Sequence, residues 1–347
     1  MEHRTNTHQS FWDVLPRPFF VLAPMEAVTD VVFRHVVKKA GAPDLFFTEF
    51  ANATGWVHAG EKAIGGRLIK TDDEQPIVAQ IWGGEPGDME SFARHCAELG
   101  YNGIDINMGC PAKSAVKSGG SALIQKPDVA VAAIAAAKTA GLPVSVKTRL
   151  GYSRVDEWQA WITALLQQDL AALTIHLRTK KEMSKVPAHY ELIPDIKKLR
   201  DELAPETLLI INGDIRDRAH GLELVKKYGI DGIMIGRGVF QNPFCFAKLE
   251  EYGISNIEYS EAHLPHTTYQ IPHTDKPALI ELLKYHLNLF DLYQPQLQRP
   301  FETLKRFFKI YIRDFDGASD LRDRLMHTSS TNEVRGILKN SPAIDEN

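Results

Sequence analysis

The sequence predicts an α/β fold: a closed (β/α)8 TIM barrel followed by a small all-α helical domain. Two observations favour the barrel. Eight apolar segments of strand length recur over about 240 residues, each followed by a segment of helical periodicity, which matches the count and size of such a barrel. The first of them runs into APMEAVTD, which contains no glycine, whereas an open doubly wound sheet would carry a glycine-rich dinucleotide fingerprint there.

The predicted strands are nearly continuous apolar runs, as expected for a parallel sheet covered on its outer face. They are Phe19–Met25, Leu45–Ala51, Pro76–Gly83, Gly103–Cys110, Pro143–Gly151, Ala172–Arg178, Leu208–Ile215 and Gly232–Gly238. The helical segments are Val28–Ala40, Asp88–Leu99, Asp128–Ala140, Asp156–Leu170, Tyr190–Glu202 and Arg216–Tyr228. Glycine follows four of these helices, at Gly41, Gly100, Gly141 and Gly229, where it readily forms a left-handed C-cap.

The periodicity changes after the eighth unit. We expect a barrel domain over residues 1–250, a polar and aperiodic linker over 251–276, and a helical domain over 277–347. Within the last, Arg299–Arg313 and Ser319–Met326 are predicted helices. The segment Ala278–Tyr293 is a third, with one apolar stripe made of Leu279, Leu282, Leu283, Leu287 and Phe290.

The composition is that of a globular protein. The chain has 347 residues, 44% hydrophobic and 24% charged, with 40 Lys+Arg against 44 Asp+Glu. Three cysteines match neither a disulfide framework nor a zinc site, so we expect no metal and a reducing, cytoplasmic setting. The N-terminus has no apolar run long enough for a signal peptide or a membrane span. The net charge of −4 argues against coating of nucleic acid but leaves open an enzyme with locally clustered basic residues.

Polar residues stand at the carboxyl ends of the predicted strands, where TIM barrels build their active sites. So many buried polar groups need partners, which favours a planar, polyfunctional ligand with a charged tail. The segments NGD and GRG, at strands seven and eight, offer glycine N–H groups and one guanidinium for a phosphate. The residues at the carboxyl ends of the eight predicted strands are Pro24, Met25, Glu49, Asn52, Gln80, Asn107, Cys110, Lys147, Arg149, His176, Arg178, Asn212, Gly213, Asp214, Gly236, Arg237 and Gly238.

Lys147 lies in a strand that otherwise faces a core, and three interpretations stay open for it. It is a Schiff-base lysine, a cation beside the pyrimidine end of a flavin, or the partner of Glu49 or Asp105 in a salt bridge. The roles of the three cysteines are easier to predict than that of Lys147. Cys96 and Cys245 have the surroundings of buried packing residues, whereas Cys110 follows a strand end beside polar groups, where a thiol can exchange protons.

Together these segments resemble the tRNA-dihydrouridine synthases. The resemblance is carried, in this order, by APMEAVTD, FTEFAN, AQIWG, DINMGCPAK followed by KSGGSALIQ, VKTRLG, IHLRT, INGDI and GIMIGRGVFQNPF. It implies an FMN-dependent reductase that saturates the C5–C6 bond of particular uridines in tRNA, with NADPH as electron donor. Hydride would pass from flavin N5 to C6, and a proton from Cys110 to C5.

The resemblance also implies roles for single residues. Cys110 is the catalytic acid, Asn107 a uracil contact and Arg178 an RNA contact. The family usually has glycine between the His and Arg of the sixth strand; here Leu177 would narrow the pocket rim or point into the barrel wall. The implied flavin contacts are Pro24, Met25, Glu26, Gln80 and Lys147, then His176 near the phosphate side, with Asn212, Gly213, Asp214, Gly236 and Arg237 at the phosphate end.

Two basic clusters are candidates for tRNA binding. A charge run is usually a solvated face, but two of them flanking a nucleotide pocket favour RNA contact. The first is Lys305, Arg306, Lys309 and Arg313, on one face of a predicted helix; the second, at the mouth, is Lys113, Lys117, Lys180, Lys181 and Lys185.

Two other functions remain to be weighed. One is a flavin barrel like dihydroorotate or dihydropyrimidine dehydrogenase that acts on a free pyrimidine, which would need neither the basic mouth nor the helical domain. The other is an RNA-binding barrel without chemistry, which the presence of Cys110, Lys147 and Arg237 disfavours.

Overall fold

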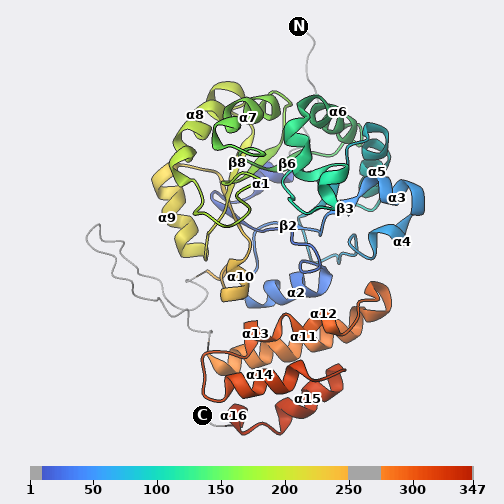
Figure 1. Ribbon diagram of the computed structural model, residues 1–347, viewed down its shortest axis with the longest axis vertical. Coiled ribbons are helices and arrows are strands. Elements are labelled where there is room, and N and C mark those ends of the chain that lie inside the picture. Colours follow the sequence, from blue (N-terminus) through green and yellow to red (C-terminus); the bar gives the residue numbers. More distant parts are fainter. Residues whose placement is uncertain (1–9, 249–274, 346–347) are drawn as a thin grey trace. The chain divides into compact units, whose positions relative to one another are not determined.

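The computed structural model describes residues 10–248 and 275–345. All but the last two residues of the expected linker, 251–276, lie outside this part. The described chain divides into two compact units (Figure 1). The barrel unit comprises residues up to 31 with 43–215 and 219–236, and the helical unit comprises 32–42, 216–218 and the residues from 237 onward.

The barrel unit contains parallel strands surrounded by helices, as predicted (Figure 1). The pairing order is β1-β9-β8-β7-β6-β5-β4-β2, β3 also pairs with β4, and a bridge between Val21 and Leu45 nearly closes the ring. The strands are β1 (Phe19–Leu22), β2 (Phe46–Phe47), β3 (Ala51–Asn52), β4 (Ile77–Trp82), β5 (Gly103–Asn107), β6 (Val144–Arg149), β7 (Ala172–His176), β8 (Leu208–Asn212) and β9 (Gly232–Ile235).

The second predicted strand is split into β2 and β3, which together fill one of the eight positions. The cause is Thr48: its hydroxyl accepts the Gln80 N–H at 2.9 Å, so a side chain replaces a backbone partner of the ladder. Most other strands end a few residues earlier than predicted, so Pro24, Met25 and Cys110 lie in the turns that follow the strands.

The helices of the barrel unit follow the predicted alternation. The segment 25–29 forms a turn instead of the predicted start of a helix, so α2 begins at Val31 rather than Val28. The helices are α1 (Phe11–Val14), α2 (Val31–Ala40), most of which belongs to the helical unit, α3 (Ala53–Ala59), α4 (Glu61–Ile64), α5 (Pro86–Glu98), α6 (Pro127–Lys138), α7 (Trp158–Leu166), α8 (Ile193–Leu203) and α9 (Arg218–Tyr228), with 3₁₀ turns η1 (Ala115–Lys117), η2 (Gly120–Gln125), η3 (Val155–Glu157) and η4 (Tyr190–Leu192).

Three of the four predicted glycine caps are confirmed. Gly100, Gly141 and Gly229 have positive φ angles of 73°, 74° and 65°. Gly41 is not among the positive-φ glycines, so the prediction of a left-handed cap there is wrong. Its small size is needed for another reason, because a Cβ at Gly41 would approach the backbone nitrogen of Ala247 to 2.7 Å.

An apolar core fills the amino-terminal end of the barrel. Trp12 and Leu15, in and just after α1, pack with Phe19, Val78 and Ile210 from the strands. These strand residues face inward, and side chains alternate along a strand, so residues two positions further on also face the interior. The polar groups described below therefore lie above the apolar core, toward the carboxyl ends of the strands.

The helical unit continues with α10 (Gly238–Gln241), α11 (Lys276–Leu297), α12 (Glu302–Lys305), α13 (Phe308–Tyr311), α14 (Ala318–Met326), α15 (Thr331–Lys339) and α16 (Pro342–Asp345). The predicted apolar stripe of α11 is confirmed as buried. The predicted helix Arg299–Arg313 is interrupted. Phe307 packs on Phe33 and His286 at ring distances of 4.8 and 5.0 Å, and its N–H bonds to Leu304 with tight i→i−3 spacing.

Candidate active site at the carboxyl end of the barrel

Polar side chains from five strands, β4 to β8, face the interior above the apolar core. The strand register places Gln80 beside Asp105, Asn107 beside Lys147, and His176 beside Asn212. Gln80 and Asp105 are fully buried, and Asn107 and Asn212 are 6% and 8% exposed. The prediction that polar residues at the strand ends converge is therefore confirmed for these residues.

A continuous hydrogen-bonded chain joins three of these strands. Asp105 accepts from Ser145 Oγ and from Gln80 Nε2, both at 2.6 Å. Gln80 Oε1 accepts from Asn107 Nδ2 at 3.1 Å, and Asn107 Oδ1 accepts the N–H groups of Gly109 and Cys110 at 3.1 and 2.9 Å. Burial raises the pKa of Asp105 to about 6, which its hydrogen bonds and the charge of Lys147 partly offset.

Lys147 is bound to an amide oxygen and not to a carboxylate. Its Nζ donates to Asn212 Oδ1 at 3.2 Å, so neither of the predicted salt bridges, to Glu49 or to Asp105, is its hydrogen bond in the structure. Burial, together with the neighbouring Arg149, lowers the pKa of Lys147 to about 8. Its strand partner Thr174 has a buried hydroxyl that lacks a hydrogen-bond partner among the described residues.

Cys110 lies in a tight turn and is partly exposed, whereas Cys96 and Cys245 are buried as predicted. The Cys110 carbonyl accepts the Ser121 N–H at 3.1 Å. Burial raises the pKa of its thiol, and so does the Glu26 carboxylate, against the opposite effects of the Ala112 N–H, Arg149 and Lys147. Cys110 is thus a protonated thiol at neutral pH that lies within electrostatic range of Lys147 and Glu26.

The turn after β1 carries Pro24, Met25 and Glu26. Pro24 is buried, and the Met25 N–H donates to Thr29 Oγ1 at 2.9 Å. Glu26 forms an ion pair with Arg67, which also donates to the Ile64 carbonyl at 2.7 Å. The segment around Arg67 offered no recognisable motif in the sequence; the structure shows that it anchors Glu26.

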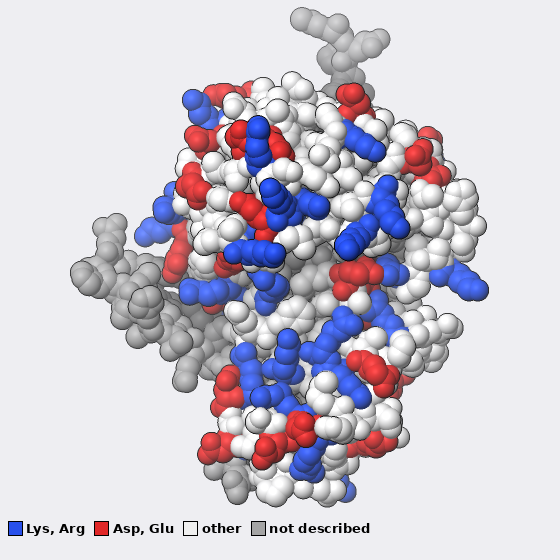
Figure 2. All heavy atoms as spheres, in the orientation of Figure 1, with Lys and Arg blue, Asp and Glu red and all other residues white. Residues whose placement is uncertain are grey.

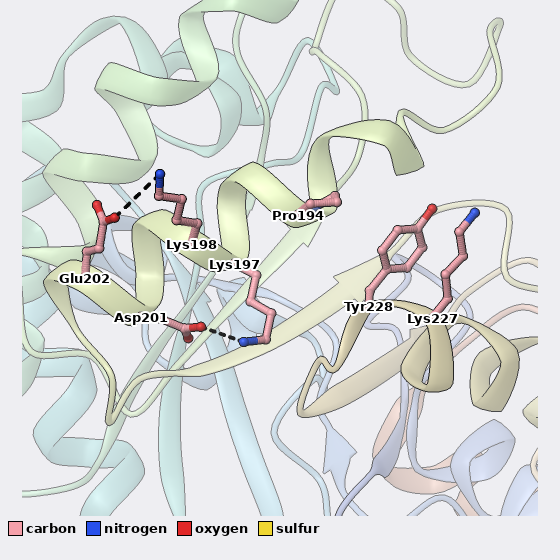
Figure 3. A pocket seen from close by; sticks show the side chains of 7 residues that line it. All are labelled: Pro194, Lys197, Lys198, Asp201, Glu202, Lys227 and Tyr228. Atoms are coloured by element: carbon pink, nitrogen blue, oxygen red, sulfur yellow. Dashed lines mark hydrogen bonds and ion pairs between the residues drawn. The ribbon is translucent and has the colours of Figure 1, made fainter.

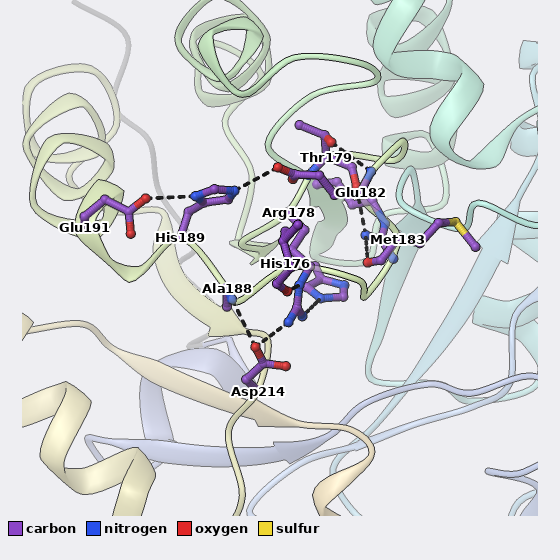
Figure 4. Close-up of polar contacts among 11 residues, drawn as sticks. His176, Arg178, Thr179, Glu182, Met183, Ala188, His189, Glu191 and Asp214 are labelled. Atoms are coloured by element: carbon purple, nitrogen blue, oxygen red, sulfur yellow. Dashed lines mark hydrogen bonds and ion pairs between the residues drawn. The ribbon is translucent and has the colours of Figure 1, made fainter.

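His176 is hydrogen-bonded to Arg178, which in turn pairs with Asp214 (Figure 4). Arg178 donates to His176 Nε2 at 3.1 Å and to the Val186 carbonyl at 2.6 Å, and forms an ion pair with Asp214. Arg178 is 2% exposed, so a contact with RNA would require these bonds to rearrange. Leu177 is fully buried, which agrees with a side chain that points into the barrel wall.

The loop after β7 is held by arginine and histidine (Figure 4). Arg149 donates to the carbonyls of Thr179 and Met183 at 3.2 and 3.0 Å and, through Nε, to Gly109 at 2.8 Å. His189 bridges two carboxylates, Glu182 at 3.0 Å and Glu191 at 2.8 Å. Arg149 therefore ties this loop to the turn that precedes Cys110.

The segment after β8 has a backbone that favours glycine. Gly213 has a φ of 125°, and a Cβ there would meet Ala188 Cβ at 3.1 Å and His176 Cδ2 at 3.2 Å. After β9, a Cβ on Gly236 would meet Ala23 Cβ at 3.5 Å, which is an ordinary contact, and Arg237 is exposed.

We predict that Gly213→Ala lowers stability by on the order of 1–3 kcal/mol, because alanine is strained at this φ. Thermal unfolding measures the effect. The control Gly336→Ala lies inside α15, where nothing stands within 4 Å of the new Cβ, and should be neutral or slightly stabilising. Equal melting temperatures for Gly213→Ala and the parent would contradict the prediction.

Comparison with known proteins identifies the chain. The sequence profile of the dihydrouridine synthase (Dus) family matches residues 21–346. The chain belongs to the dihydrouridine synthase family. It is therefore an enzyme, as the resemblance predicted, and the alternative of a barrel without chemistry is set aside.

Relatives within the dihydrouridine synthase family cover nearly the whole chain. A probable tRNA-dihydrouridine synthase 2 of Bacillus subtilis (strain 168) is 57% identical over 95% of this chain and 96% of its own length. A probable tRNA-dihydrouridine synthase of Staphylococcus aureus (strain COL) is 54% identical over 95% of both chains. A solved 2-naphthoyl-CoA reductase complex matches 67% of this chain and 50% of its own, with a TM-score of 0.49 and 10% identity, which is too distant to support an inference.

The cations predicted to bind tRNA differ in their surroundings in this dihydrouridine synthase. Lys113, Lys117, Arg306 and Lys309 are exposed. Lys305 is 17% exposed, with its Nζ 5.6 Å from the centre of the Phe301 ring, and Arg313 lies 3.2 Å from Asp314. Figure 2 shows Lys and Arg interspersed with acidic residues on the visible face.

A hollow of about 480 Å³ lies on the outer surface of the barrel unit, between α8 and α9 (Figure 3). It is lined by Pro194, Lys197, Lys198, Asp201, Glu202, Lys227 and Tyr228. Lys197 pairs with Asp201 at 2.5 Å and Lys198 with Glu202 at 4.0 Å, and no strand-end residue lines it. It is therefore separate from the candidate active site of this family member.

Two further findings concern membrane-spanning helices and metal-binding groups among the described residues. None of the helices in residues 10–248 and 275–345 is long and apolar enough to cross a membrane. In the same residues, no group of three or more His, Cys, Asp or Glu could hold a metal ion.

Two residues have larger roles in the site than the sequence predicts. Asp105 is predicted only as a salt-bridge partner, although a carboxylate in the alternating run GIDIN is itself a signal of an inward-facing polar group. Arg149 was recognised at a strand end but had no role; its partners are carbonyls in two distant loops, which no motif indicates.

Proposed function

We propose that this enzyme reduces the C5–C6 double bond of uridines in tRNA, with bound FMN and with NADPH as electron donor. The observation that carries the proposal is the convergence of Cys110, Asn107 and Lys147 at the carboxyl end of a barrel in a chain of the dihydrouridine synthase family. Its curated relatives are named as probable tRNA-dihydrouridine synthases.

The residues fit a flavin. The Lys147 ammonium makes one hydrogen bond within the described part of the chain, so it can donate further to an acceptor-rich ring edge, and the Thr174 hydroxyl beside it is also without a partner there. We assign the flavin ring to Pro24, Met25, Glu26, Gln80 and Lys147. His176 is assigned to the phosphate side, and the phosphate end itself to Asn212, Gly213, Asp214, Gly236 and Arg237. When bound, FMN would supply the hydride that the uracil ring accepts at C6.

Cys110 supplies the proton in this proposal. Reduction at C6 leaves negative charge at C5 and O4, and one proton delivered to C5 completes the saturated bond. Burial raises the pKa of the thiol, so it remains protonated and available at neutral pH. Asn107, whose side-chain oxygen accepts the Cys110 N–H, would contact the uracil. The base must leave the RNA stack to reach this turn.

Lys147 would carry charge where it is needed. With a pKa of about 8 it is largely protonated near neutral pH, so it can stabilise negative charge that develops on the bound pyrimidine or flavin. The Schiff-base interpretation becomes unnecessary, because reduction of a ring double bond has no step that requires an imine.

The barrel domain would thus bind FMN, and the helical domain would contribute to tRNA binding. Lys113 of the barrel and Lys309 of α13 are exposed and belong to the two basic clusters. We assign Lys113, Lys305, Arg306, Lys309 and Arg313 to tRNA contacts, and we leave Arg178 as a candidate that depends on rearrangement of its buried bonds.

We predict that Lys113→Gln and Lys309→Gln each weaken tRNA binding and reduce the slope of log K against log salt by about one. Fluorescence anisotropy with labelled tRNA over a range of salt concentrations measures both effects. Lys198→Gln, an equally simple change at an exposed lysine of α8, serves as the control and should leave the slope unchanged. Affinity that is insensitive to salt would contradict the assignment.

The proposed function is tested with the purified full chain, FMN and NADPH. Unmodified tRNA transcripts should gain the mass of two hydrogens at particular uridines, while free uracil and orotate should not be reduced. Reaction of the free bases with no change in tRNA would instead establish a metabolic pyrimidine enzyme.

A further inference from the structure

Asp105 is a buried carboxylate that no step of the proposed reaction uses. It lies in the middle of β5, is fully buried, and faces the barrel interior at the register of Gln80 and Ser145. A buried carboxylate is costly to maintain, and here burial raises its pKa to about 6. Replacement by an apolar or amide group would avoid that cost, so the hydrogen bonds of Asp105 need an explanation.

These hydrogen bonds have a fixed direction. An ionised carboxylate only accepts, so Gln80 must present its Nε2 to Asp105 and turn its Oε1 toward Asn107. Asn107 must then present its Nδ2 to Gln80 at 3.1 Å, which leaves its Oδ1 for the turn. At the other end, the backbone N–H groups of Gly109 and Cys110 only donate, and they require that same oxygen.

Both ends of the chain thus demand the same orientation of the two amides. An amide side chain alone has no such preference, because exchanging its O and N changes its shape very little. With Asp105 at one end, a flipped Gln80 would place its oxygen against a carboxylate. A flipped Asn107 would place its NH2 group against two N–H donors.

We propose that Asp105 is a positioning residue that fixes the orientation of the Gln80 and Asn107 amides and thereby the turn that carries Cys110. It acts over two side chains and touches neither the thiol nor the substrate. The same orientation decides which atoms of Gln80 and Asn107 remain for ligands: one N–H of each NH2 group and the second lone pair of Gln80 Oε1, because Asn107 Oδ1 already accepts two N–H groups.

Asp105→Asn tests the proposal without changing the shape of the site. The new amide at position 105 can face Gln80 with its oxygen or with its NH2 group, and the second choice reverses both amides and repels the Gly109 and Cys110 N–H groups. We expect the turn to loosen and the Cys110 thiolate to react about threefold to tenfold faster with iodoacetamide, the range that corresponds to loss of one ordinary hydrogen bond.

The experiment measures alkylation of the full-length protein over a range of pH, with mass spectrometry to locate the modified cysteine. The pH dependence separates the intrinsic rate of the thiolate from its pKa. Cys96 and Cys245 are 0% and 1% exposed and should stay unmodified. The matched control is Asp231→Asn at the other end of the barrel, where the carboxylate accepts from Leu209 N and Arg200 at 2.8 and 2.7 Å. It should lower the melting temperature and leave the alkylation rate unchanged.

A second pair of variants distinguishes direction from charge. Asn107→Asp places a carboxylate at each side of Gln80, whose single NH2 group cannot serve both. Repulsion from Gln80 Oε1 then displaces the carboxylate at position 107 from the Gly109 and Cys110 N–H groups, so the turn should loosen more than in Asp105→Asn. The double variant Asp105→Asn with Asn107→Asp reverses the whole chain. The amide now at position 105 donates to Gln80, Gln80 donates to the carboxylate now at position 107, and that carboxylate again accepts the N–H groups of Gly109 and Cys110. The alkylation rate of the double variant should return toward that of the parent.

Two results would overturn the proposal: an unchanged thiolate rate in Asp105→Asn, or a double variant that reacts as fast as Asn107→Asp alone. If Asp105 acted only through its buried charge, the thiolate rate in Asp105→Asn would be unchanged. The single variant therefore separates an effect of charge from an effect of amide orientation. The alkylation readout needs neither flavin nor tRNA. Only the catalytic consequence, a lower kcat on tRNA in Asp105→Asn, rests on the proposed function; a faster thiolate with unchanged kcat would uphold the positioning role and reject Cys110 as the acid.

Discussion

Cys110→Ala is expected to abolish nearly all dihydrouridine formation and to leave the flavin chemistry intact. Loss of a general acid typically costs about 10²–10⁴-fold in rate. The backbone N–H and carbonyl of Cys110 make hydrogen bonds that alanine retains, so the substitution removes only the contact between the sulfur and the Ala112 N–H. Alanine should therefore preserve FMN content and reduction by NADPH, followed by absorbance, while turnover on tRNA transcripts falls by this factor.

Two further variants serve as controls for Cys110→Ala. Cys96→Ala removes a buried sulfur from α5 and should reduce stability without changing turnover, because Cys96 is fully buried in a helix. Cys110→Ser tests the acid itself: a hydroxyl of similar size donates a proton far less readily than a thiol. Turnover of Cys110→Ala within a few-fold of the parent enzyme would remove the thiol from the mechanism.

Lys147→Met is expected to change function and stability in opposite directions. Without the ammonium, flavin should bind more weakly or be reduced more slowly by NADPH. The unliganded chain should in turn become more stable, because methionine fills a similar volume without an interior charge whose burial lowers its pKa. Flavin content, single-turnover reduction rates and thermal unfolding of flavin-free protein measure these effects.

The difference in stability between Lys147→Met and the parent should depend on pH. The pKa of Lys147 falls from its usual 10.5 to about 8 on folding, so the unfolded chain binds more protons between these values. The charge on Lys147 therefore lowers stability fully below pH 8, and this penalty disappears as the pH rises toward 10.5. The stability gap between Lys147→Met and the parent should close over this window. A gap that stays constant would show that the lysine is not desolvated.

Much of the fold follows from patterns within single segments. Alternation of apolar strands and amphipathic helices gave the barrel, and Gly100, Gly141 and Gly229 indicated where helices end. The errors occur where a distant group intervenes. The Thr48 hydroxyl replaces a ladder partner and divides a strand, and Phe307 packs on Phe33 and His286, which interrupts the last basic helix.

The candidate site shows the same division. Cys110, Asn107 and Lys147 were predicted because parallel strands bring their carboxyl ends together. The partners of these residues were not. The ammonium of Lys147 binds Asn212, which is 65 residues away along the chain, and Arg67 pairs with Glu26 from a segment without a recognisable motif.

The sequence by itself determined the order of strands and helices, the family, and which residue types stand at the mouth of the barrel. The order of elements and the residue types follow from periodicity and spacing, which are properties of neighbouring residues, and the family follows from the resemblance of the motifs. The tertiary structure alone decided that Asp105, Gln80 and Asn107 form one directed chain and that Arg178 is engaged in buried bonds. It also decided that burial raises the pKa of Cys110. Hydrogen-bond direction and desolvation depend on groups brought together from distant segments, and no local pattern contains that information.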